Sequence, residues 1–165
     1  MNVLDSPSMV AMFEYWRGNK AASISAFTMG QFCTPYQMDL FRRLAQRLGR
    51  EFPSTWQFHT RGRKMVDFEL GTIAHGEGGR VILHPLKSQL PGSWGRMLNP
   101  PPVRRDSDER AILNVVTDSS LVLFFACSPA LQDLEYQTAG IESRGKRGVL
   151  TILSNEVSPA ILPGQ

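Results

Sequence analysis

The stretch SLVLFFAC, residues 120–127, is apolar at almost every position. A strand with one face in water alternates apolar and polar side chains, whereas a strand covered on both faces does not. The stretch therefore predicts a central, buried strand, and the other elements are arranged around it. A basic turn, RGKR (144–147), and a second apolar segment, GVLTIL (148–153), follow it. The second segment predicts a last strand.

One clear helix is predicted over residues 35–50. Thr34 can cap its amino end, Pro35 suits its first turn, and Gly49 suits its carboxyl end. The apolar residues that recur at helical spacing along one face are Met38, Phe41, Leu44, Ala45 and Leu48. The arginines lie mostly off that face, so the helix is expected to be amphipathic.

Most of the remaining chain predicts short strands separated by turns. The predicted strands are ASISAF (22–27), TWQFHT (55–60), MVDFEL (65–70), RVILHPL (80–86) and AILNVV (111–116). In MVDFEL, apolar and polar residues alternate as in a strand with one wet face. HGEGGR (75–80) predicts a hairpin turn, and the proline-rich segment 90–110 predicts a long loop. This series predicts an all-β fold, a sandwich with one helix inserted near residues 35–50.

Composition restricts the class of protein. The chain has 165 residues, a formal net charge of +3 and a pI near 9.1, which predicts one mildly basic domain. A hydrophobic fraction of 42% and a charged fraction of 20% exclude a disordered chain. The two cysteines are too few for a disulfide framework, which favours a reducing compartment. No signal peptide and no membrane span are expected from the sequence.

A thiol enzyme is one hypothesis for the chemistry. Cys33 lies directly before the predicted helix, where the helix dipole can lower the pKa of a thiol. However, Tyr36 occupies the second cysteine position of a CxxC motif, and no βαβ pattern follows. A half-buried structural cysteine is therefore the favoured interpretation.

Metal-binding, cofactor-binding and catalytic patterns are weak. The residues considered for a metal or nuclease site were His59, Asp67, Glu69, His75 and His84. None of them is paired at a spacing such as HxxxH or HxH. The sequence also has no GxSxG, P-loop or GxGxxG motif. We therefore predict no catalytic, cofactor-binding or metal-binding residues, no cofactor and no enzymatic activity.

Basic residues gather in three predicted loops. The clusters are Arg61, Arg63 and Lys64; Arg104, Arg105 and Arg110; and Arg144, Lys146 and Arg147. Each cluster could contact phosphates. Solvated loop charge is the simpler interpretation, but a small basic nucleic-acid-binding protein remains an alternative function.

The segment MFEYWRG (12–18) carries a resemblance to a known family. It resembles the F-x-Y-W-R-G segment of capsid proteins of picorna-like viruses, in particular dicistroviruses and iflaviruses. Three further stretches are similar to that family in the same order: TWQFHTRGRKMVDFELGTI, GGRVILHPLKSQLP and LVLFFACSPALQDLEYQ. In the last of these, Asp133 and Glu135 match acidic positions. The resemblance covers about residues 8–140.

The resemblance implies a jelly-roll coat protein of a small positive-strand RNA virus. The expected organisation is a single capsid domain over residues 1–165, with an N-terminal arm (1–12) and a C-terminal extension (141–165). The implied partners are other capsid subunits, genomic RNA bound without sequence preference, and a host receptor. The implied locations are the icosahedral virion and, during assembly, the host cytoplasm.

Two expectations concern particular residues. Phe13 and Trp16 are expected to be buried, with Arg17 bonded to backbone carbonyls or to a carboxylate. Gln165 suits cleavage by a viral polyprotein protease, so residues 158–165 are expected to be irregular and accessible.

Overall fold

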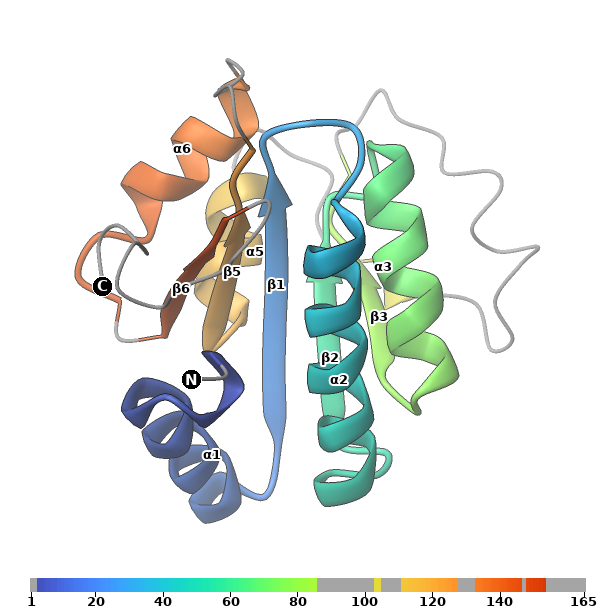
Figure 1. Cartoon of the computed structure of the whole chain (residues 1–165), viewed down its shortest axis with the longest axis vertical. Helices are drawn as coiled ribbons and strands as arrows, with labels where there is room; N and C mark the ends of the chain where they lie inside the picture. The colour runs from blue at the N-terminus through green and yellow to red at the C-terminus, as the bar shows by residue number, and fades with distance from the viewer. Residues whose placement is uncertain (1–2, 86–102, 105–110, 128–132, 147, 154–165) are drawn as a thin grey trace.

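A six-stranded parallel sheet forms the centre of the molecule (Figure 1). The computed structural model describes residues 3–85, 103–104, 111–127, 133–146 and 148–153. Within these residues the strand order is β4-β3-β2-β1-β5-β6. The strands are β1 (Ala22–Thr28), β2 (Trp56–Thr60), β3 (Arg80–Leu83), β4 (Val103–Arg104), β5 (Leu121–Phe125) and β6 (Val149–Ile152). The predicted all-β jelly roll is wrong, because this sheet is parallel and its strands alternate with helices.

Helices cover both faces of the sheet. They are α1 (Pro7–Asn19), α2 (Pro35–Glu51), α3 (Met65–Gly76), α5 (Ala111–Asp118) and α6 (Leu134–Glu142), and a short 3-10 helix, Val3–Asp5, precedes α1. The main apolar core joins α1, α2 and α3 to one face, and a second core joins α5 and α6 to the other. In Figure 1, α1 lies at the lower end, and α2 and α3 lie in front of β2 and β3.

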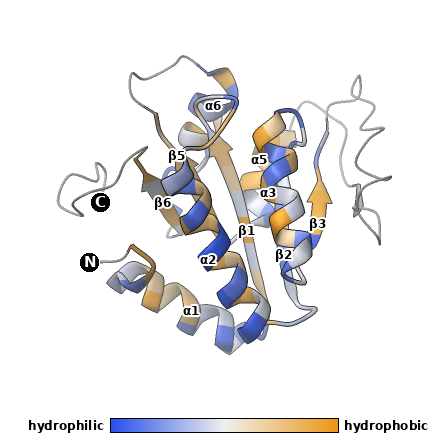
Figure 2. Cartoon of the chain, turned by 45° about the vertical axis from the view of Figure 1, so that its right-hand side comes forward, coloured by the Kyte–Doolittle hydropathy of each residue, from blue (hydrophilic) through white to orange (hydrophobic). Residues whose placement is uncertain are grey.

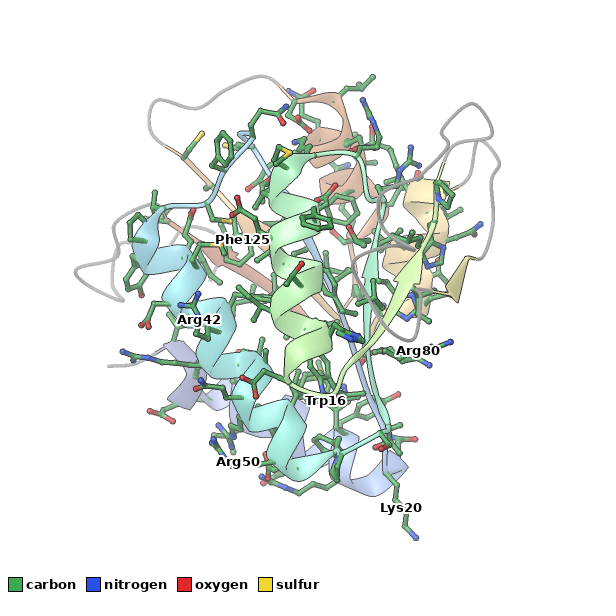
Figure 3. All side chains as sticks on the ribbon, turned by 90° about the vertical axis from the view of Figure 1, so that its right-hand side faces the viewer. Trp16, Lys20, Arg42, Arg50, Arg80 and Phe125 are labelled. Atoms are coloured by element: carbon green, nitrogen blue, oxygen red, sulfur yellow. The ribbon has the colours of Figure 1, made fainter. Side chains whose placement is uncertain are left out.

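Two sequence predictions are confirmed by this arrangement. All five residues of β5 are buried, and the strand lies inside the sheet between β1 and β6. The helix predicted at 35–50 is α2, in which Thr34 and Gln37 form a reciprocal capping box at the amino end. Its outward face is hydrophilic in Figure 2, and Arg42 and Arg50 point away from the sheet in Figure 3.

Two predicted strands are helices. MVDFEL begins α3, in which Val66, Leu70 and Ala74 are fully buried at a spacing of four residues. AILNVV lies in α5, in which Ala111 and Val115 have the same spacing. A six-residue window can satisfy both a period of two and a period of 3.6, so alternation in MVDFEL did not separate the two states.

The aromatic segment also forms a helix. Ser6 caps α1 by accepting a hydrogen bond from the Met9 N–H group, so the helix begins inside the segment expected to be an arm. Phe13 and Trp16 are buried, as predicted. Arg17 pairs with a carboxylate, as predicted: its Nη2 atom lies 2.6 Å from Glu51 Oε1.

Two further expectations concern a membrane span and the C-terminal residues. No helix among the described residues has the length and apolar character needed to cross a membrane. The prediction for residues 158–165 lies outside the described residues.

Candidate functional site

The strand order creates a switch point beside β1. The connection after β1 leads to α2 on one face of the sheet, whereas the connection after β5 leads to α6 on the other. In open α/β sheets, ligands bind at the carboxyl ends of the strands where neighbouring connections diverge in this way. A ligand site is therefore expected at the carboxyl ends of β1, β2 and β5.

A basic turn follows β2 at this edge. Gly62 adopts a φ of 68°, a left-handed conformation that glycine accepts without steric cost, and the chain turns there between Arg61 and Arg63. The Arg61 side chain is buried, with 3% exposure, whereas the Arg63 side chain is 41% exposed. Lys64 lies at the N-cap position of α3, and its Nζ atom donates a 2.7 Å hydrogen bond to the Thr28 carbonyl at the end of β1.

Two acidic residues from the start of α6 face this turn. Glu135 Oε1 lies 3.0 Å from Arg61 Nε and 2.9 Å from Arg63 Nη1. Asp133 Oδ2 accepts a 2.6 Å hydrogen bond from Lys64 Nζ, and Asp133 Oδ1 caps α6. The β2–α3 turn and the start of α6 are thereby joined across the end of β1 by side chains of opposite charge.

The contact between Arg61 and Glu135 is an ion pair without a well-formed hydrogen bond. Both Arg61 Nε and Glu135 Oε1 are buried, and neither has a hydrogen-bond partner among the described residues despite their 3.0 Å separation. Burial lowers the pKa of the Arg61 guanidinium, while Glu135 acts in the opposite direction. A buried polar atom without a hydrogen bond is costly, so the contact of Arg61 with Glu135 is less favourable than a well-aligned ion pair would be.

Asp67 holds the basic turn in place through hydrogen bonds to its backbone. Its Oδ2 atom accepts hydrogen bonds from the backbone N–H groups of Arg63 (2.9 Å) and Lys64 (3.0 Å), which fixes the turn to the first turn of α3. Burial raises the pKa of Asp67 to about 6, although these two hydrogen bonds act in the lowering direction, and the charge of Glu135 adds to the rise.

A cleft of about 420 Å³ opens beside these charged groups. Its lining residues are Gln31, Arg61, Arg63, Lys64, Ile112, Asp133, Leu134, Glu135 and Thr138. This volume lies within the range usual for small-molecule sites. A second hollow of about 450 Å³ is lined by residues such as Met12, Tyr15 and Gly148, and it holds one basic residue, Lys146. The charged cleft is the better site because its polar groups converge at the switch point.

Cys33 lies near this edge, but its environment is opposite to the one a thiol enzyme needs. Burial raises the pKa of the Cys33 thiol to about 12, and the charges of Glu69 and Asp67 contribute to the rise. A thiolate at the start of α2 is therefore disfavoured at neutral pH.

We expect Cys33 to react with iodoacetamide at pH 7.5 at least about 30-fold more slowly than free cysteine, because the loss of thiolate exceeds the gain in its nucleophilicity. Peptide mass spectrometry over a time course separates Cys33 from Cys127, and unfolding in urea provides the control in which both react freely. Reaction of folded Cys33 at the rate of free cysteine would restore the thiol-enzyme hypothesis.

The structure places the other candidate residues in different surroundings. Glu69 and His75 lie on α3. His59 of β2 and His84, which directly follows β3, meet with ring nitrogens 2.9 Å apart. Of the remaining basic residues, Arg144 and Lys146 follow α6, and the side chain of Arg104 and residues 105, 110 and 147 lie outside the described part of the chain.

The acidic half of the charged cleft was not predicted from the sequence. Asp133 and Glu135 were assigned only as acidic positions of a capsid-like strand. A helix start was nevertheless readable, because Asp133 precedes LEYQTAGIE, which forms α6, and its side chain accepts the Tyr136 N–H. A helix start at Asp133 predicts a negative charge at the carboxyl edge of the sheet.

Comparisons with known proteins show the class of fold. No family model and no curated protein sequence matches the chain. Solved structures do match, among them TM1055, a structural genomics target, DNA processing protein A (DprA) from Streptococcus pneumoniae, and the molybdenum cofactor carrier protein from Chlamydomonas reinhardtii. The chain is an α/β protein with a Rossmann-like, doubly wound sheet similar to theirs.

The similarity is one of fold. TM1055 is 11% identical with a TM-score of 0.50, and the match covers 77% of this chain and 76% of that one. DprA is 13% identical with a TM-score of 0.53, covering 84% of this chain and 53% of DprA, so this chain spans about half of that protein. The cofactor carrier is 14% identical with a TM-score of 0.53, covering 79% and 76%.

These matches overturn the capsid hypothesis. The structural neighbours are Rossmann-like α/β proteins and not viral coat proteins, so the resemblance based on MFEYWRG was wrong. The alternative function, a small basic nucleic-acid-binding protein, gains no support from the comparisons either. The expected partners and the expected location in a virion depended on the capsid resemblance and lose their basis with it.

Proposed function

We propose that this chain binds a small anionic ligand of the nucleotide or phosphorylated-cofactor class in the cleft at the carboxyl ends of β1, β2 and β5. The proposal is one of binding and assigns no chemical step. It depends on one observation above all: Arg61, Arg63 and Lys64 converge on one cleft at the switch point of the sheet.

Arg63 is the residue best placed to contact such a ligand. Its side chain is 41% exposed, so it can leave Glu135 without opening the protein interior. A guanidinium binds phosphate oxygens through two parallel N–H groups, which is stronger and more directional than its contact with one carboxylate oxygen. Exchange of Glu135 for a ligand phosphate is therefore chemically favourable at this position.

Arg61 and Lys64 supply fixed positive charge behind Arg63. Arg61 is buried and lies 3.0 Å from Glu135, so it contributes positive charge at the site and makes no direct contact with a ligand through Nε. Lys64 is held by Thr28 and Asp133. Similarity of fold to a molybdenum cofactor carrier is consistent with a role in holding a small molecule, although at 14% identity it carries no information about individual residues.

Isothermal titration with ADP, AMP and pyrophosphate tests the proposal. We expect at least one of the three to bind in the micromolar range, and Arg63→Ala to weaken it at least about 10-fold, or 1.4 kcal/mol. Arg42→Ala is the matched control, because Arg42 is an exposed arginine on the outward face of α2. We expect it to leave the affinity unchanged.

Two outcomes would contradict the proposal. One is the absence of binding by all three compounds at millimolar concentration. The other is an equal loss of affinity in Arg63→Ala and Arg42→Ala, since this would indicate general electrostatic attraction and not a site. Circular dichroism of both variants establishes that the fold is retained.

A further inference from the structure

A second group of side chains lies on the other face of the sheet from α2 and α3. Phe58 of β2 packs into the core formed with those helices, so its neighbour His59 points to the opposite face. His59 is level with Ile82 of β3, and His84 follows two residues later on the same face. Asp118 is the last residue of α5, a helix that covers this face.

These three residues form a compact cluster of metal-ligand types. His59 Nδ1 lies 2.9 Å from His84 Nε2, and His84 Nε2 lies 3.9 Å from Asp118 Oδ2. One ligand atom from each residue falls within 4.8 Å of the others. His59 and His84 are buried, with 1% and 0% exposure, whereas the Asp118 side chain is 36% exposed.

Gln57 is hydrogen-bonded to the outer nitrogen of His59. The Gln57 Oε1 atom lies 3.1 Å from His59 Nε2, and an amide oxygen can only accept a hydrogen bond. With the Gln57 amide in this orientation, His59 carries its proton on Nε2, and the lone pair of Nδ1 in the neutral ring points at His84. Such an outer hydrogen bond is what orients histidine ligands in metal sites.

We propose that His59, His84 and Asp118 form a binding site for a divalent transition-metal ion such as Zn²⁺. Two imidazoles and one carboxylate are the donor set that this class of ion prefers, and three protein ligands leave a coordination position open. At Zn–N distances of about 2.0–2.1 Å, tetrahedral ligand atoms lie about 3.3–3.4 Å apart. The two imidazoles need to separate by only a few tenths of an ångström from their 2.9 Å contact, and Asp118, on an exposed helix end, can approach.

The competing explanation is an N–H···N hydrogen bond between two structural histidines. A short nitrogen–nitrogen distance is expected for a hydrogen-bonded histidine pair and for a metal site, but only the metal site requires Asp118. The metal site also does not depend on the ligand proposed for the charged cleft, because none of its three residues lines that cleft.

Titration of the full chain with Zn²⁺ by calorimetry, and with Co²⁺ by visible absorption, distinguishes the two explanations. We expect one ion per chain with micromolar or tighter affinity, weakening as pH falls because protons compete for the imidazoles. His84→Gln should weaken binding at least 100-fold. Asp118→Asn, at an exposed position that folding tolerates, should weaken it at least 10-fold.

His75→Gln is the matched control. It removes the remaining histidine of the chain, which lies near the end of α3, and should leave stoichiometry and affinity unchanged. The proposal is overturned if no ion binds more tightly than about 10 μM, or if Asp118→Asn binds as the wild type does. It is equally overturned if His75→Gln abolishes binding, since an adventitious site at His75 would then account for it.

Discussion

Replacing Trp16 with alanine is expected to lower the free energy of unfolding by about 3–5 kcal/mol, the range for large aromatic-to-alanine changes in a core. Trp16 is 1% exposed and packs edge-to-face against Phe13 and Phe52, with ring centroids 5.1 and 6.2 Å away. Its Nε1–H also donates a 2.5 Å hydrogen bond to Ser120 Oγ, directly before β5. The substitution therefore removes a buried volume and the link between α1 and the sheet.

Urea unfolding followed by circular dichroism measures this effect. Tyr15→Ala is the matched control, because Tyr15 is the neighbouring aromatic residue of α1 and is 59% exposed. We expect the control to change stability by no more than about 0.5 kcal/mol. Similar losses in the two variants would show that α1 does not belong to the cooperative core.

Glu135→Gln is expected to cost about 3–5 kcal/mol, because removing one partner of a buried ion pair leaves an uncompensated buried charge. Glu135 approaches both Arg61 and Arg63, but Arg63 is partly exposed and can find water. The cost therefore falls mainly on Arg61, which is 4% exposed. Glu142→Gln, an exposed change on the same helix, should alter stability by no more than about 0.5 kcal/mol.

A second substitution tests the cause of that loss. Adding Arg61→Met to Glu135→Gln removes the stranded charge, so part of the lost stability should return. If the double variant is no more stable than Glu135→Gln alone, the loss arises from packing around α6 and not from the ion pair. If Glu135→Gln is as mild as Glu142→Gln, the pair contributes little to stability.

Much of the secondary structure was readable from the sequence, but its assembly was not. β1, β2, β3, β5 and β6 and the helix α2 were all predicted near their observed positions. The error lies in the connections: the sequence pattern predicts strands where the structure has α3 and α5, and it predicts no helix at α1 or α6. With those four elements misassigned, a β-α alternation became a run of strands, and a run of strands implies a sandwich.

Other features of the sequence indicate the α/β class that the structure shows. The fully apolar β5 is typical of a strand in a parallel sheet, which needs helices on both faces. In α1, Ser6 followed by Pro7 is a helix start, and Met9, Phe13 and Trp16 repeat at helical spacing. The capsid-like motif covers that same segment, and a short motif of this kind matches a strand-forming family although the segment forms a helix.

The candidate site depends on tertiary structure more than the helices and strands do, so less of it was predictable from the sequence. Arg61, Arg63 and Lys64 were noted as a cluster, but their partner Glu135 lies far along the chain, and only the strand order brings α6 beside the end of β2. His59 and His84 show the same limit. They lack a local ligand spacing because their proximity arises from the pairing of β2 with β3.

The position of β1 between β2 and β5 has a consequence for how the chain folds while it is being synthesised. β2 can pair with β1 soon after it leaves the ribosome, but the other edge of β1 waits for Leu121–Phe125. At about 5–20 residues per second, the interval between Thr28 and Phe125 lasts roughly 5–20 s. During that time an apolar strand edge that includes Ile24 and Ala26 lacks its native neighbour, and such edges recruit other chains. The nascent chain is therefore most prone to aggregation before β5 emerges, and early chaperone contact should matter most in that interval.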